Sequence, residues 1–157
     1  MRLRDTILFG VSLGYSRAQV LATLGVPYQE SFIADDNKTS LTYSPESTNE
    51  TGLFGPPPGG AVIRLDSNGR VDQIRARGGS LKLGRAETVF EGPRRDVLAC
   101  LAGLNPFCEG ETFLSFLDGM EDDTKLEPPV SLTITFHEDR LRDVELEYGP
   151  QPTGWAF

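Results

Sequence analysis

The sequence has little cysteine and histidine, and each shortage narrows what the protein can be. It contains two cysteines, Cys100 and Cys108, and one histidine in 157 residues. Two cysteines provide no disulfide framework, and these two lack the spacing of metal ligands. Cys100 lies in a helical apolar pattern and is expected to be buried filler, although a bond between the two stays open. A reducing cytoplasm is the simplest location. A periplasmic protein whose signal peptide had been removed would show the same sequence features.

Long hydrophobic runs are also missing. The start, MRLRDTILFGVSLG, carries two arginines and then a short apolar stretch that glycine and serine interrupt. This stretch is too short to span a bilayer. Asp5 and the lack of a small-residue cleavage site argue against a signal peptide. We therefore expect no membrane span and no secretion signal in this sequence.

The sequence has fewer positively charged residues than negatively charged ones. Lys and Arg total 15 against 23 Asp and Glu, which gives a formal net charge of -8. Nucleic-acid binding requires clustered Lys and Arg, so this balance argues against DNA or RNA as a ligand. An acidic surface steers basic proteins towards itself, although it also serves simply to keep a protein soluble.

The sequence contains no motif typical of a catalytic, phosphate-binding or metal site. His137 stands beside Glu138 and Asp139, and an exposed turn residue is a better interpretation than a catalytic base without a partner. The acidic run at 121–123 does not have the spacing of an EF-hand loop, and the glycine-rich segment 52–60 lacks the Gly-Lys-Ser/Thr of a phosphate loop. The sequence therefore predicts a protein that is not an enzyme and has no cofactor and no metal.

The clearest feature that is present is a short helix predicted at 15–27, with residues typical of a helix start and a helix end. Ser16 and Gln19 have the spacing of a capping box. An apolar stripe at helical spacing follows them. Gly25 suits the left-handed position that ends a helix, and Pro27 prevents continuation.

The plan of the first half recurs in the second. Arg94–Leu101 aligns with Arg17–Leu24 and shares its Arg, its Val-Leu-Ala and its final Leu. An Asn-Gly pair at 68–69 between apolar runs predicts a hairpin, and alternating residues predict further strands. The strand candidates are 31–33, 40–43, 61–65 and 71–76 in the first half, and 112–117, 130–136 and 142–148 in the second.

These elements predict an α+β fold. We expect a tandem repeat of helix plus antiparallel β-meander, with the helices packed on one face of a curved antiparallel sheet. The first repeat spans 1–79 and the second spans 80–157, and the two share one globular unit. The other, polar face of such a sheet is a docking surface.

Two segments carry a resemblance to a known family. The pattern Ser-Arg-x-Gln-Val-Leu-x-x-Leu-Gly-x-Pro at 16–27, then Thr-Tyr, then Asn-Gly-Arg-Val-x-x-Ile at 68–74, resembles the BamE (SmpA/OmlA) family of small envelope lipoproteins. The resemblance covers Val11–Ile74 and, more loosely, Val89–Val144. A tandem pair of such units is similar in plan to the β-lactamase inhibitory proteins, which dock a sheet and projecting loops onto an enzyme. The resemblance implies helices on an antiparallel sheet and, by analogy, a protein-binding role.

Three groups of residues are candidates for partner binding. A proline-stiffened loop presents apolar side chains that lose little entropy on binding, although Phe54 tucked into its own body is an equal alternative. The other two groups are acidic and can mimic nucleic-acid phosphates towards a basic enzyme, although a solvated acidic loop is the default interpretation. The candidates are Leu53 and Phe54 in the proline loop, Asp118, Glu121, Asp122 and Asp123 in the acidic loop, and Asp143, Glu145 and Glu147 on a strand face.

The sequence thus favours a cytoplasmic, non-enzymatic inhibitor that binds another protein. Its most specific form is a bacterial immunity protein that neutralises a cognate toxin, with a basic toxin or enzyme domain as the partner. The alternative is a BamE-type structural or assembly accessory domain of the cell envelope. The oligomeric state stays open.

Overall fold

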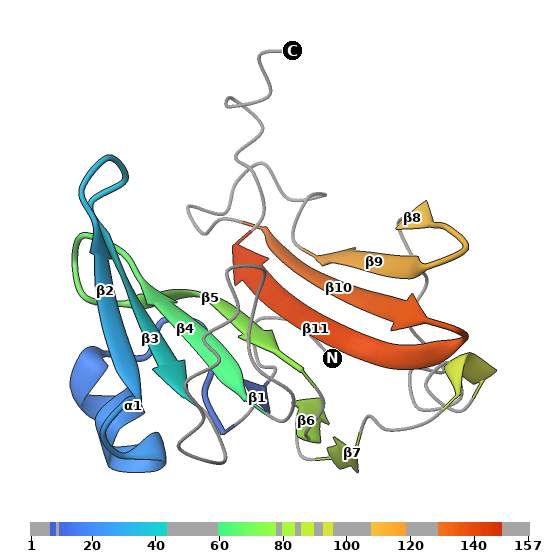
Figure 1. Ribbon diagram of the computed structural model, residues 1–157, viewed down its shortest axis with the longest axis horizontal. Coiled ribbons are helices and arrows are strands. Elements are labelled where there is room, and N and C mark those ends of the chain that lie inside the picture. Colours follow the sequence, from blue (N-terminus) through green and yellow to red (C-terminus); the bar gives the residue numbers. More distant parts are fainter. Residues whose placement is uncertain are drawn as a thin grey trace.

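A computed structural model describes residues 7–8, 10–43, 60–77, 80–83, 86–89, 93–95, 108–118 and 129–148 of the chain. Strands dominate these residues, and α1 is the single helix whose full bounds lie within them (Figure 1). The elements are β1 (Ile7–Leu8), α1 (Arg17–Leu24), β2 (Gln29–Ile33), β3 (Lys38–Tyr43), β4 (Ala61–Leu65), β5 (Val71–Ala76), β6 (Ser80–Leu83), β7 (Ala86–Val89), β8 (Cys108–Glu109), β9 (Phe113–Asp118), β10 (Val130–His137) and β11 (Arg140–Tyr148).

One large antiparallel sheet forms the body of the molecule. Its strand order is β2-β3-β4-β5-β11-β10-β9-β8, and β8 is only two residues long. The two halves of the chain meet where β5 pairs with β11, with Ile74 opposite Leu146. A smaller sheet has the order β1-β6-β7. The large sheet is strongly twisted, so its two ends run in different directions (Figure 1).

The strands follow from alternating side chains and from turns of specific chemistry. Along β10, every second residue from Val130 to Phe136 is buried and the residues between are half-buried, as the sequence predicts. The β4–β5 hairpin turns through Asn68 and Gly69, and Gly69 has a φ of 75°. At the β10–β11 turn, Glu138 and Asp139 have φ values of 52° and 62°. Two consecutive residues with positive φ are typical of the tight turn that joins twisted antiparallel strands.

The helix predicted at the start of the chain is confirmed. The Ser16 hydroxyl accepts from the backbone N–H of Gln19 at 3.2 Å, and the Ser16 N–H donates to the Gln19 side chain at 2.8 Å. Both halves of the capping box are therefore formed. Gly25 ends the helix with a φ of 81°, and its N–H donates to the carbonyl of Leu21 at 2.9 Å. Val20 is the buried residue of the helix.

The hydrophobic core lies on one face of the large sheet, the face on which α1 packs (Figure 1). Val20 joins this core from α1, and the Tyr43 hydroxyl donates to the carbonyl of Gly25 at 3.0 Å. The central residues of the core are fully buried; they include Leu41, Ile63, Ile74, Leu132, Ile134 and Leu146. The side chains between them in sequence point to the opposite face of the sheet.

The predicted fold class is wrong. The described residues are mostly β, with one large antiparallel sheet and one short helix whose full bounds are described, and they do not form a tandem repeat of helix plus β-meander with helices packed on the sheet. One reason is that 80–83 and 86–89, next to the expected repeat boundary, form strands β6 and β7, and β6 pairs with β1. The β5–β11 pairing joins strands of both halves into one sheet, which is compatible with the expected single unit. Most of the expected second helix at 94–101 lies outside the described residues.

Candidate functional site

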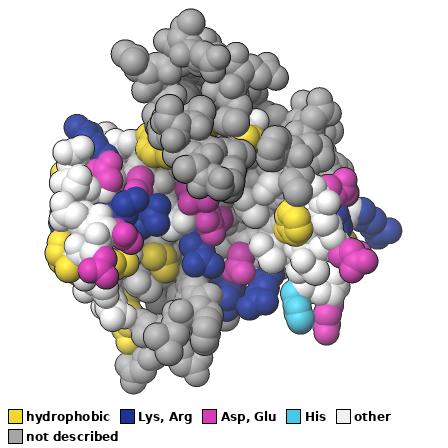
Figure 2. All heavy atoms as spheres, turned by 90° about the horizontal axis from the view of Figure 1, so that it is seen from above, with side chains coloured by type: hydrophobic (Ala, Val, Ile, Leu, Met, Phe, Trp, Pro, Cys, Tyr) yellow, Lys and Arg dark blue, Asp and Glu magenta, His cyan; other side chains and the backbone are white. Residues whose placement is uncertain are grey.

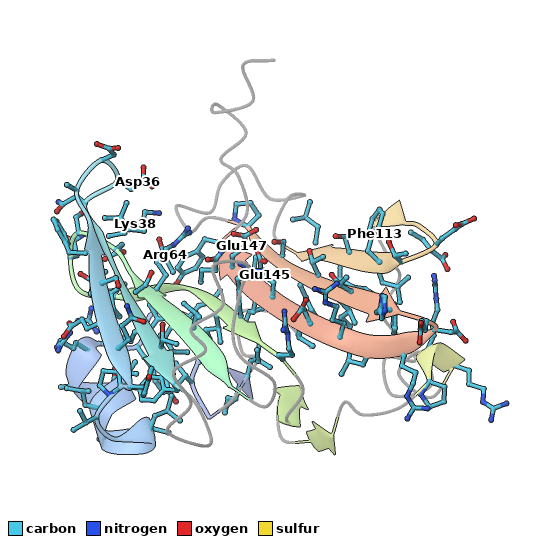
Figure 3. All side chains as sticks on the ribbon, in the orientation of Figure 1. Asp36, Lys38, Arg64, Phe113, Glu145 and Glu147 are labelled. Carbon is cyan, nitrogen blue, oxygen red and sulfur yellow. The ribbon has the colours of Figure 1, made fainter. Side chains whose placement is uncertain are left out.

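The candidate site is the polar face of the large sheet, opposite the core. We define the polar face by the half-buried or nearly buried side chains that alternate with core residues along the sheet. These side chains come from β3, β4, β5, β9, β10 and β11. In Figure 3 the labelled Lys38, Arg64, Glu145 and Glu147 lie on the same side of the sheet, away from α1. The charged members are Lys38, Arg64, Asp72, Arg75, Arg77, Asp143, Glu145 and Glu147, and the neutral ones include Thr42, Gln73, Phe113, Ser115, Thr133 and Thr135.

Asp72 joins three strands at one end of the polar face. Its carboxylate accepts from Lys38 Nζ at 2.7 Å and from Arg64 Nε at 2.8 Å. The register of β4 and β5 shifts between Arg64 and Leu65, and this irregularity turns Asp72 towards both cations. Only 11% of the Asp72 side chain is exposed, so these ion pairs are screened less than surface pairs.

Gln73 and two glutamates form the centre of the polar face. The Gln73 amide donates to Glu145 at 3.0 Å and to Glu147 at 2.9 Å. Arg75 Nε lies 3.2 Å from the second oxygen of Glu145. Burial raises the pKa of Glu145, and the neighbouring Glu147 carboxylate raises it further, while Arg75 opposes the shift. Like charges side by side in a half-buried site favour the protonated form of one of them.

The remaining contacts of the polar face link Arg77, the residue after β5, to β11, and β9 to β10. Arg77 donates to Asp143 at 3.1 Å. The hydroxyls of Ser115 and Thr133 lie 3.0 Å apart and share a hydrogen bond. Phe113 marks the far end, where a methyl group added to Gly110 would meet its ring at 2.3 Å. Side-chain contacts therefore connect β3, β4, β5 and β11, and a separate contact connects β9 and β10.

Charge on the polar face is balanced, in contrast to the net charge of the whole chain. Four cations (Lys38, Arg64, Arg75 and Arg77) accompany the four carboxylates of the face. Figure 2 shows acidic and basic side chains intermingled over the part of this surface that is coloured. The excess of negative charge in the sequence, -8, must therefore be carried elsewhere in the chain.

The structure brings together one of the three groups of candidate residues. Asp143, Glu145 and Glu147 do lie together on the polar face of β11, but each is hydrogen-bonded or ion-paired within the chain. Their contacts within the chain therefore involve Gln73, Arg75 and Arg77, and their role in partner binding stays a prediction. The side chains of the other candidate residues are not among those that the structure describes. These residues are Leu53, Phe54, Asp118, Glu121, Asp122 and Asp123.

Sequence reasoning missed the cations of the polar face. Arg64 and Arg75 each stand between two core residues of an alternating strand, which was the signal that could have placed them opposite the core. His137 is exposed at the β10–β11 turn, 3.9 Å from Glu138, and lies away from this cluster. Within the described residues, no group of three or more His, Cys, Asp or Glu is placed to bind a metal ion. The same residues contain no helix long and apolar enough to cross a membrane.

No protein-family model, no curated protein and no solved structure matches this chain. The resemblance to the BamE family therefore stays a prediction from short motifs.

Proposed function

We propose that this protein binds and inhibits another protein, and that the polar face of the sheet makes the contact. The most specific form of the proposal is a bacterial immunity protein with a basic toxin or enzyme domain as its partner. The proposal concerns binding alone and assigns no reaction to the chain.

The observation that supports the proposal is that contacts within the chain hold many side chains of the polar face in place. Asp72 is fixed by two cations, and Glu145 is fixed by Gln73 and Arg75. Side chains that are already ordered lose little conformational entropy when a partner docks on them. Ordered charges of both signs also favour one partner orientation over others.

The arrangement of charge supports a partner with a mixed surface. Lys38 and Arg64 lie towards one end of the face, and Glu145 and Glu147 lie at its centre (Figure 3). A complementary partner would place acceptors against the first pair and donors against the second. The net charge of -8 would accelerate its encounter with a basic partner.

The proposal is tested with a partner captured on the tagged chain from the native host and identified by mass spectrometry. Its affinity is then measured by calorimetry for the wild type and for Thr42→Arg and Thr135→Arg. Both threonines are half-buried on the polar face, at β3 and β10. A bulky cation there should block docking and weaken binding by about tenfold or more.

Ala22→Arg provides the matched control. Ala22 is exposed on α1, on the other side of the sheet, and the substitution adds the same charge. We expect its affinity to stay within about twofold of the wild type, because alanine-to-arginine changes on a helix surface perturb little. Equal affinity for all four proteins would exclude the polar face as the contact. A captured partner whose activity is unchanged by the chain would exclude inhibition.

A further inference from the structure

The exposed apolar side chains of the described residues are concentrated at one edge of the large sheet. The four large apolar side chains that are exposed are Val26 at 90%, Tyr28 at 40%, Phe32 at 63% and Ile33 at 42%. All of them lie in β2 or in the few residues before it. Clustered exposed apolar residues mark interaction surfaces, whereas isolated ones are ordinary.

Strand β2 is also the outermost strand of that sheet. It pairs with β3, and no other strand in the described part of the chain pairs with its outer side. Every residue of β2 is exposed. Proteins usually protect such an edge with lysine, proline or a bulge, because its backbone groups can pair with another strand. The sequence of β2, QESFI, has neither lysine nor proline, and its pairing with β3 is regular.

The one charge in β2 is neutralised within the chain. Both oxygens of Glu30 accept from the Arg17 guanidinium of α1. This hydrogen-bonded pair lowers the pKa of Glu30. The edge is therefore locally neutral although the chain as a whole is strongly acidic, so two such edges can approach without facing like charges.

We propose that β2 pairs antiparallel with β2 of a second copy of this chain and forms a symmetric dimer with one continuous sheet. A two-fold axis at Ser31, the middle residue of β2, places each Glu30 opposite Phe32 of the other copy and each Gln29 opposite Ile33. The small Ser31 side chains meet on the axis. A two-fold contact of this kind is self-complementary and closed, so it gives dimers and not fibres. The dimer buries Phe32 and Ile33, and it does not depend on the function proposed for the polar face.

The dimer is tested by sedimentation velocity at increasing concentration, from micromolar to submillimolar. The wild type should convert from monomer to dimer. Ser31→Lys and Ser31→Glu each place like charges opposite one another on the axis, so each should weaken the dimer by about fivefold or more. An equimolar mixture of the two variants should dimerise more strongly than either alone, because opposite charges then meet.

Two further variants make the result decisive. Phe32→Ala removes an apolar side chain from each copy without adding a charge opposite Glu30, and it should weaken the dimer by about tenfold or more. Ala22→Lys, on the exposed surface of α1, changes the net charge as Ser31→Lys does and should leave dimerisation unchanged. A wild type that stays monomeric throughout would overturn the proposal, and so would a dimer that survives both Phe32→Ala and Ser31→Lys. A monomeric chain whose β2 instead pairs with a strand of another protein would also overturn it.

Discussion

At one end of the polar face, the carboxylate of Asp72 holds side chains from two other strands. Lys38 and Arg64 both donate to it, and all three side chains are at most half exposed. Removing one member of such a cluster costs more than losing a surface ion pair, because the remaining charges are left without compensation. Asp72 therefore fixes the geometry of the neighbouring cations as well as contributing to stability.

We expect Asp72→Ala to lower the free energy of unfolding by about 2–3 kcal/mol, because two half-buried cations lose their shared acceptor. Urea denaturation followed by circular dichroism gives the value. Asp36→Ala is the control, since Asp36 is exposed in the β2–β3 turn and its loss should change stability by at most about 0.5 kcal/mol. Equal effects of the two substitutions would mean that the Asp72 cluster is energetically an ordinary surface feature.

Glu145 makes stability depend on pH. Its pKa is raised above the ordinary value of 4.5 because it is buried and lies beside Glu147. The folded protein then holds this proton more tightly than the unfolded chain does. Stability should therefore fall as the pH rises from about 4.5 through the raised pKa of the folded state.

Glu145→Gln removes this titration while keeping the shape of the side chain. We expect the variant to gain stability relative to the wild type as the pH rises above 4.5, and the relative gain to disappear at lower pH, where both states of the wild type are protonated. Urea denaturation over a pH series measures the difference. Glu138→Gln, at an exposed turn position, controls for the loss of a carboxylate. If the stability difference between Glu145→Gln and the wild type did not change with pH, or changed in the opposite direction, the raised pKa of Glu145 would be contradicted.

At the scale of elements, turns set the pairing of neighbouring strands. In the β4–β5 hairpin, Asp66 accepts from the N–H groups of Asn68 and Arg70 at 2.9 and 3.0 Å. Gly69 adopts a left-handed conformation with a φ of 75°, and nothing lies within 4 Å of the position where a Cβ would stand. Any penalty for a side chain at this position is therefore conformational and not steric.

Gly69→Ala should destabilise the protein by about 1 kcal/mol, because alanine disfavours positive φ. Gly69→Asn should cost less, since asparagine tolerates the left-handed region better than alanine. Thermal or urea unfolding of the two variants provides the comparison. If asparagine proved at least as damaging as alanine, the loss would have to come from something other than backbone conformation.

At the scale of the whole molecule, local patterns predict elements better than they predict pairing. Ser16 and Gln19 identify α1, and the alternation along 130–136 identifies β10, because both signals lie within a few residues. The pairing of β5 with β11 depends on contacts between the two halves of the chain, and no local pattern reveals it. The predicted fold class failed on a different point, because the sequence patterns indicated a helix in each half whereas strands dominate the described residues.

The same distinction applies to the candidate site. Because alternate residues of a strand share a face, the sequence places Asp143, Glu145 and Glu147 together correctly. Their partners Gln73 and Arg75 belong to β5 and Arg77 follows it directly, and the register of β5 against β11 brings them into reach. The sequence therefore predicts the carboxylates of the polar face but not their neutralisation.

The central claim is that the polar face binds the partner. The most direct test is a nuclear magnetic resonance titration of the methyl-labelled chain with the partner captured from the native host. The methyl signals of Thr42, Thr133 and Thr135 report on the polar face, and those of Ala18 and Ala22 report on the exposed surface of α1. We predict that the threonine signals shift and broaden while the alanine signals stay in place. Changes confined to Ala18 and Ala22, with the threonines unmoved, would contradict the account.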